Sequence, residues 1–156
     1  MPLTPPAPAF RHILLPTDGS DLSDRAADTA LALARSMGAR LTALHVVPPY
    51  APPLPDMGVG FTYAMTEDEY ERAVNNQAGE MLARVAERAA ESGVDCDTRI
   101  VTDSAPWNAI VGEARKGGCD AVVMASHGRR GLAALVLGSE TQKVLTHSDV
   151  PVLVTR

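Results

Sequence analysis

The first group of residues that could bind a ligand is Pro16-Thr17-Asp18-Gly19-Ser20. It directly follows a short apolar segment and directly precedes a helical pattern. Asp18 has two interpretations at this position. Its carboxylate can cap the helix that follows, or it can contact a ribose hydroxyl or a metal-bound phosphate. The residues alone leave both interpretations open.

A second group combines glycines, a hydroxyl and two arginines around the predicted start of the last helix. The first N–H groups of a helix have no partner within it and lie at the positive end of its dipole, so they bind phosphate well. Gly138 would let the backbone approach an anion, and Gly128 permits a turn that a side chain would hinder. Arginine side chains neutralise phosphate charge. The group comprises Met124, Ala125, Ser126, His127, Gly128, Arg129, Arg130, Gly131, Gly138 and Ser139.

Glu140 argues against a phosphate at this helix start. A carboxylate in the first turn stabilises the helix but repels a second anion. The side chain could instead point to solvent or help to hold a metal ion. The residues alone do not decide between these possibilities.

The remaining reactive side chains do not predict catalysis. The four histidines lack metal-ligand spacing, and we favour structural or surface roles for all but His127, which lies in the candidate loop. Cys96 and Cys119 fall in or beside apolar segments, which is typical of buried, unreactive thiols. Because no nucleophile–base pair is evident and the common catalytic motifs are absent, we expect no dedicated catalysis.

Short apolar segments alternate with helical patterns along the chain, and this order predicts the scaffold that positions both groups. Thr66-Glu67-Asp68-Glu69 and Ser139-Glu140-Thr141-Gln142 are each typical of a capping box at a helix start. The alternation predicts an α/β fold, a doubly wound five-stranded parallel sheet with helices on both faces. In such a sheet the ligand lies beyond the carboxyl ends of the strands, at the topological switch point. The predicted strands are residues 12–16, 41–47, 96–102, 121–124 and 151–154, and the predicted helices begin near residues 20, 67, 106 and 139.

Length and composition favour one compact domain over residues 1–156. The chain has a net charge of −5, whereas a non-specific nucleic-acid binder is basic. No apolar run approaches the ~18 residues of a membrane helix, and the start has no secretory signal pattern, so we expect a cytoplasmic protein without a membrane partner. Proline-rich stretches predict a loose N-terminal tail at residues 1–10 and a long flexible loop at residues 48–66.

From Arg11 to Arg156 the chain resembles the universal stress protein family. Three segments are similar to family landmarks: Pro16-Thr17-Asp18-Gly19-Ser20 after the first strand, His45-Val46 in the second, and the closing Pro151-Val152-Leu153-Val154. The nucleotide-binding branch of the family carries a glycine, two residues, a glycine, nine residues, and then glycine with serine or threonine. This chain has Ala125, Gly128 and Gly138-Ser139 at those positions, so only the first glycine is replaced. The nine-residue spacing is far more specific than any single glycine.

The resemblance implies the strand order 3-2-1-4-5 of adenine nucleotide alpha hydrolase-like proteins and a site for ATP or AMP, with or without Mg. By this similarity Asp18 would contact the ribose or a divalent metal, and Val46 would lie at the adenine. Ala125 fits the site if its φ is negative and blocks it if that backbone needs a positive φ. The resemblance also implies a homodimer that pairs the last strands, residues 151–155. The residues carried over to the nucleotide site are Pro16, Thr17, Asp18, Val46, Met124, Ala125, His127, Gly128, Arg129, Arg130, Gly138, Ser139, Glu140 and Thr141.

Three functions are consistent with these residues. The leading hypothesis is an adenine-nucleotide-binding stress-response protein that acts as a dimeric sensor or regulator, with at most slow ATP hydrolysis. The second is a nucleotide-free dimeric interaction module whose phosphate site is closed by Ala125 and Glu140. The third, and the least favoured, is an adenylating or nucleotide-cleaving enzyme on the same fold.

Overall fold

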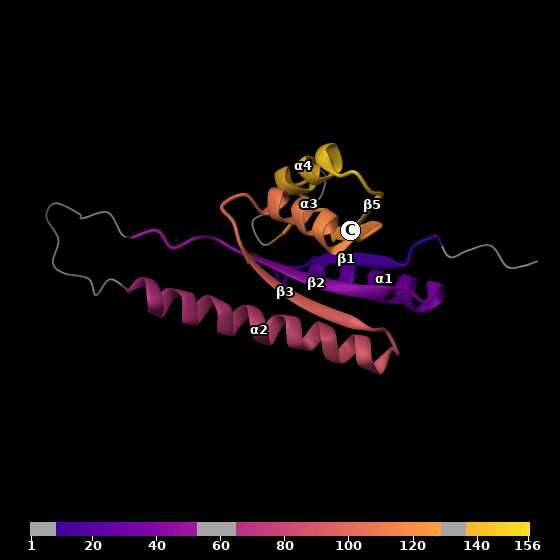
Figure 1. Cartoon of the computed structure of the whole chain (residues 1–156), viewed down its shortest axis with the longest axis horizontal. Coiled ribbons are helices and arrows are strands. Elements are labelled where there is room, and N and C mark those ends of the chain that lie inside the picture. Colours follow the sequence, from indigo (N-terminus) through magenta and orange to yellow (C-terminus); the bar gives the residue numbers. More distant parts are fainter. Residues whose placement is uncertain (1–8, 53–64, 129–136) are drawn as a thin grey trace, which may run out of the picture.

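The computed structural model describes residues 9–52, 65–128 and 137–156, which form one parallel sheet and four helices (Figure 1). The five strands lie in the order β3-β2-β1-β4-β5, and every recorded strand pair is parallel. This order confirms the predicted doubly wound sheet. The strands are β1 (His12–Pro16), β2 (Arg40–Val47), β3 (Cys96–Thr102), β4 (Ala121–Ala125) and β5 (Val152–Thr155).

Helices cover both faces of the sheet, as predicted. Figure 1 shows α2 below the sheet and α3 and α4 above it. Because strand side chains alternate between faces, Leu15 joins the core beneath α1 and α2, while its neighbour Leu14 joins the core beneath α3 and α4. The helices are α1 (Asp21–Met37), α2 (Glu67–Glu91), α3 (Pro106–Gly117) and α4 (Ser139–His147).

The first three helices begin and end at the residues that the sequence indicates. The Ser20 side chain accepts a hydrogen bond from the Ser23 amide and caps α1, which Gly38 ends with a left-handed φ of 64°. Thr66 caps α2 in the predicted capping box. Pro106 occupies the first turn of α3, where its missing N–H has no helical partner to lose.

The second predicted capping box is wrong. Gly138, not Ser139, is the N-cap residue of α4, and it supplies no side-chain hydrogen bond. Ser139 is the first helical residue and lies exposed. Gln142 binds the Leu137 carbonyl instead of the backbone of a cap residue. The box pattern fails because the partners of Glu140 and Gln142 lie outside the first turn of α4.

Several predicted features lie outside the described residues. Residues 1–8 of the predicted tail and 53–64 of the predicted loop are among them, and so are Arg129 and Arg130. Of the remaining tail residues, Phe10 packs partly buried against the core. Within the described part of the chain, no helix is both long and apolar enough to cross a membrane.

Candidate functional site

The two predicted groups of site residues come together at the carboxyl ends of β1 and β4. The chain leaves β1 for α1 on one face and leaves β4 for α4 on the other, so these adjacent strands form the topological switch point. Their ladder pairs only Ile13 with Ala121 and Leu14 with Val122, so it ends before either strand does. Beyond that point β1 continues to pair with β2 and β4 with β5, but no pairing of β1 with β4 is recorded.

Asp18 lies in the turn between β1 and α1, but it does not cap the helix. Ser20 takes that role, which excludes the capping interpretation of Asp18. One carboxylate oxygen of Asp18, Oδ1, accepts a hydrogen bond of 3.0 Å from the Ser20 amide. Gly19 completes the turn with a φ of 72°, a conformation that favours glycine.

The second carboxylate oxygen of Asp18 points at Gly128, beyond the end of β4. A Cβ atom at Gly128 would lie 2.4 Å from Oδ2 of Asp18, which is well inside van der Waals contact. The turn argument for Gly128 is wrong, because its φ lies outside the left-handed range. A side chain at Gly128 would therefore have to displace the Asp18 carboxylate, which approaches this backbone closely.

Gly138, at the start of α4, is also closely surrounded by neighbouring atoms. Its φ is −61°, so its conformation is open to any residue. A Cβ atom there would lie 3.1–3.2 Å from the Cβ and Cα atoms of His127 and from the Ser126 carbonyl oxygen. The Gly138 amide donates a hydrogen bond of 2.9 Å to that same carbonyl. The absence of a side chain therefore lets α4 begin directly against the end of β4.

A buried hydroxyl adds a second connection between β4 and α4. Thr141 is 2% exposed, and its Oγ1 donates to the Ala125 carbonyl at 3.1 Å. Ala125 itself is buried, and no residue other than glycine has a positive φ within the described residues. The methyl group of Ala125 is therefore compatible with its backbone, which satisfies the condition that the sequence left open.

The Glu140 carboxylate connects α4 with the neighbouring helix α3. Its Oε2 accepts a hydrogen bond of 2.9 Å from the Trp107 amide in the first turn of α3, and its Oε1 lies 3.2 Å from Lys143 Nζ. The N-cap residue of α3, Ala105, has no side chain that could make this bond. Glu140 therefore caps a neighbouring helix, an interaction that no local pattern predicted.

The first turn of α4 keeps backbone donors available. Within the described residues, the N–H groups of Ser139, Glu140 and Thr141 have no hydrogen-bond acceptor. In contrast, Ser20 and Thr66 cap α1 and α2, and Glu140 binds the first turn of α3. The positive end of the α4 dipole and these amides together favour an anion.

Other predicted site residues have structural partners. Thr17 is buried, its Oγ1 contacts Ser23 Oγ at 3.1 Å, and its carbonyl lies 2.7 Å from Nδ1 of His45. His127 is half-buried, and its Nδ1 lies 3.0 Å from Ser126 Oγ. Three further predicted site residues belong to strands. Pro16 ends β1, Val46 lies near the end of β2, and buried Met124 lies near the end of β4.

Neither a metal cluster nor a reactive thiol is found among the residues that the structure describes. No group of three or more His, Cys, Asp or Glu side chains there could hold a metal ion. Cys119 is buried, and burial raises the pKa of its thiol to about 11. Burial also raises the pKa of Cys96. Both thiols are neutral at pH 7, in agreement with the interpretation of unreactive cysteines.

The fold and this arrangement define a class of α/β proteins that carry a polar, glycine-lined site at the switch point of a doubly wound sheet. Within that class, the model of the universal stress protein family matches residues 9–156. The chain belongs to this family.

Individual relatives agree with this assignment. The universal stress protein YxiE of Bacillus subtilis is 33% identical over 148 residues, covering 94% of this chain and 99% of that protein. The structure of UspA from Lactobacillus plantarum superposes with a TM-score of 0.79 at 26% identity, covering 94% of this chain and 97% of that one. A universal stress protein solved in complex with cAMP superposes with a TM-score of 0.69 at 26% identity, covering 94% and 97% of the two chains.

Proposed function

We propose that this protein binds an adenine nucleotide, ATP or AMP, at the carboxyl ends of β1 and β4. The observation that carries the proposal is the approach of the Asp18 carboxylate to Gly128, beside a helix start whose amides have no acceptor within the described residues. A relative of the same fold was solved with cAMP, which shares the adenine, ribose and phosphate of these ligands. Binding of this kind would make the protein a sensor or regulator in the cytoplasm.

The phosphate part of the ligand would lie at the start of α4. Ser139, Glu140 and Thr141 offer backbone N–H groups at the positive end of a helix dipole. The Glu140 carboxylate is turned to the Trp107 amide, which lessens its repulsion of an anion at that helix start. Arg129 and Arg130, which lie outside the described residues, would add positive charge.

The ribose part would lie at Asp18. A carboxylate accepts hydrogen bonds from ribose hydroxyls, and Oδ1 is already fixed by the Ser20 amide. If Mg accompanies ATP, the Asp18 carboxylate, just after the end of β1, would be its protein ligand. Mg keeps several waters and commonly binds one or two carboxylates together with the phosphates of the nucleotide, so this site does not require a cage of protein ligands.

The alternative function, a nucleotide-free interaction module, rested on Ala125 and Glu140. Ala125 has no positive φ, and Glu140 has its partners on α3 and in its own helix. Both observations weaken the argument that these residues close the phosphate site. The two observations therefore favour nucleotide binding over a closed phosphate site, and efficient catalysis is not part of the proposed function.

Calorimetric titration of the full chain with ATP·Mg and with AMP tests the proposal. We expect saturable binding of at least one of them and a loss of about tenfold in affinity for Asp18→Asn, because a charge-assisted hydrogen bond is lost. Asp21→Asn is the matched control, since Asp21 is an exposed aspartate in the first turn of α1. The absence of binding at millimolar ligand, or equal affinities for both variants and the wild type, would contradict the proposal.

A further inference from the structure

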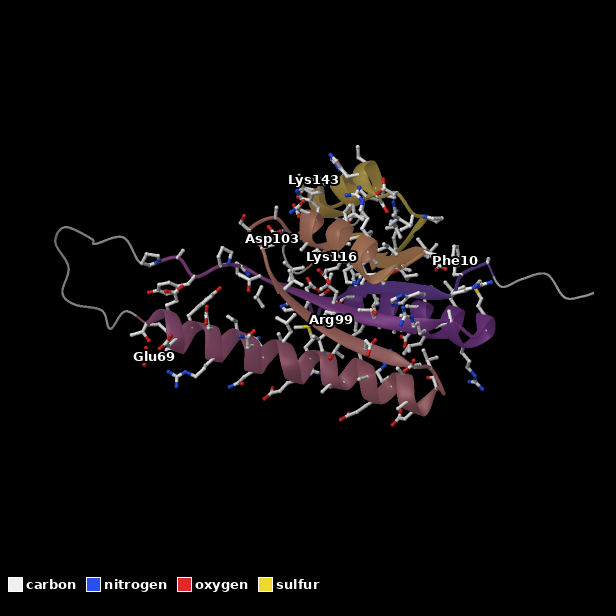
Figure 2. The ribbon with its side chains drawn as sticks, in the orientation of Figure 1. Phe10, Glu69, Arg99, Asp103, Lys116 and Lys143 are labelled. Atoms are coloured by element: carbon white, nitrogen blue, oxygen red, sulfur yellow. The ribbon has the colours of Figure 1, made fainter. Side chains whose placement is uncertain are left out.

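A polar pocket lies toward the amino-terminal ends of β1, β2 and β3, opposite to the proposed nucleotide site. Its volume is about 160 Å³. Figure 2 shows two of its residues, Lys116 on α3 and Arg99 on β3. The proposed nucleotide site lies beyond the carboxyl ends of the strands, so the two sites are separate. The pocket is lined by His12, Arg40, Thr42, Asp97, Arg99, Glu113, Lys116, Gly117 and Cys119.

Strand register explains why polar side chains gather there. Thr42 pairs with Leu14 on β1 and with Asp97 on β3, so all three share one face of the sheet. Leu14 is buried on that face beneath α3 and α4. Asp97 and Arg99 are on the same face but exposed, because β3 is the edge strand and α3 ends at Gly117 beside them. The helix layer therefore leaves this corner of the sheet open.

The pocket holds more cations than anions. Arg40 and Arg99 form no ion pair within the described residues. The third cation, Lys116, has its Nζ 3.4 Å from Glu113, so that pair is largely neutralised. Asp97 is the remaining carboxylate. Beside that one carboxylate, the pocket lining therefore includes two guanidinium groups without an ion pair among the described residues. Guanidinium groups match the planar edges of oxyanions with two parallel donors.

The floor of the pocket is buried and polar. His12 is 5% exposed and Thr42 is 7% exposed, and Nε2 of His12 lies 2.7 Å from Oγ1 of Thr42. Burial first, and then the Arg40 guanidinium, lower the pKa of His12, while Gly117, Asp120 and Asp97 oppose that shift. The imidazole is therefore neutral at pH 7. The positive charge of the pocket comes from its rim, where the arginines are.

We propose that this pocket binds a small oxyanion such as inorganic phosphate or sulfate, held by Arg40 and Arg99 above the His12–Thr42 floor. Its volume is about 160 Å³. Sites for drug-sized ligands have ~300 Å³ or more. The size suits a tetrahedral anion and excludes enclosure of a whole nucleotide.

Titration of the full chain with sodium phosphate, followed by ¹H–¹⁵N NMR, tests this site. We expect saturable shifts for the amides of Thr42, Asp97 and Arg99 that remain when the protein is saturated with ATP. Arg40→Gln and Arg99→Gln should each weaken binding about tenfold, because each removes a charged donor. Asp97→Asn should tighten it, because the competing carboxylate is lost.

Arg35→Gln is the matched control, since Arg35 is exposed on α1 and does not line this pocket. It should bind phosphate as the wild type does. The proposal is overturned by shifts that never saturate, by shifts limited to residues 138–141, or by unchanged affinity in an Arg40→Gln, Arg99→Gln double variant. Because all these side chains are exposed, the variants should fold, and a wild-type-like NMR spectrum without ligand verifies this. A parallel titration with sodium sulfate separates a general oxyanion site, where both anions bind, from one that recognises phosphate alone.

Discussion

Among single residues, Gly128 and Gly138 matter because a side chain at either position would come too close to neighbouring atoms. The sequence suggested freedom of the backbone at Gly128, but the φ of this residue is ordinary. What a side chain would disturb is the Asp18 carboxylate, 2.4 Å from the position of a Cβ atom. The position of the proposed ligand contact at Asp18 thus depends on a residue that lies more than one hundred positions further along the chain.

Gly128→Ala should displace the Asp18 carboxylate and thereby weaken ATP binding by about tenfold, as the loss of one charged hydrogen bond would. The free energy of unfolding should fall by about 1 kcal/mol or less, because a short side chain can turn aside. Calorimetry and urea denaturation measure the two effects. Gly112→Ala is the control: nothing lies within 4 Å of its Cβ position, so this change should stabilise α3 by about 0.5–1 kcal/mol. Unchanged ATP affinity in Gly128→Ala would refute the role given to Asp18.

The Cys119 thiol makes stability depend on alkaline pH. Burial raises its pKa from 9.0 to about 11, so the folded state holds the proton more tightly than the unfolded state does. The resulting stabilisation is complete below pH 9 and is lost as the pH rises from 9 to 11. Urea denaturation should therefore show a steeper fall in stability over this range for the wild type than for Cys119→Ala. Parallel curves for the two proteins would contradict the raised pKa.

At the scale of elements, Glu140 joins two helices on the same face of the sheet. Its carboxylate accepts from the Trp107 amide, and the rings of Trp107 and His147 lie 4.5 Å apart between centroids. The start of α3 is thus held by the first turn of α4, while the end of α4 packs on the same tryptophan. From the sequence alone, the Glu140 carboxylate argues against phosphate binding. In the structure this carboxylate holds the start of α3.

Glu140→Gln and Glu140→Ala separate these two effects. Alanine removes the cap of α3 and should lower the free energy of unfolding by about 1 kcal/mol, whereas the glutamine oxygen can still accept from Trp107. Both changes remove a negative charge from the start of α4 and should raise ATP affinity about two- to fivefold. Glu87→Gln, an exposed site on α2, removes the same charge far along the chain and should change neither quantity. Weaker ATP binding in Glu140→Gln would mean that Glu140 contacts the ligand favourably.

At the scale of the whole molecule, the sheet has two edges, β3 and β5. An edge strand presents unpaired backbone groups that another chain can extend. Leu153 on β5 is 45% exposed, and its neighbours Val152 and Val154 are partly buried against the core. We propose, from the family resemblance and this exposed leucine, that two copies of the chain pair through β5.

Leu153→Lys should convert this dimer to a monomer, because it places a charge in an apolar interface. Size-exclusion chromatography with light scattering should report half the mass of the wild type. Ile100→Lys is the matched control on the other edge strand, since Ile100 is 38% exposed on β3; its mass should remain that of the wild type. A monomeric wild type, or dissociation by Ile100→Lys alone, would exclude pairing through β5.

Much of the fold and part of the site could be predicted from local patterns. The bounds of the predicted strands differ from those of the observed strands by about one residue. For example, β2 is predicted at residues 41–47 and is observed at Arg40–Val47. Glycine and proline marked helix boundaries because their backbone preferences act within one turn. The capping box predicted at Ser139 was wrong, because Glu140 binds the Trp107 amide of α3 and Gln142 binds the Leu137 carbonyl just before α4.

Local sequence patterns were enough to predict the order of strands and helices along the chain, the cap at Thr66, and the carboxyl ends of the strands as the place where Asp18 and Gly128 lie. These follow from periodicity and turn preferences, which depend on near neighbours and on the handedness of the crossovers. Only the tertiary structure decided where Glu140 points, why Gly128 lacks a side chain, and that Arg40, Arg99 and Lys116 share a pocket. Such contacts join residues that are distant in the chain, and their energies depend on register and helix placement that no local pattern contains.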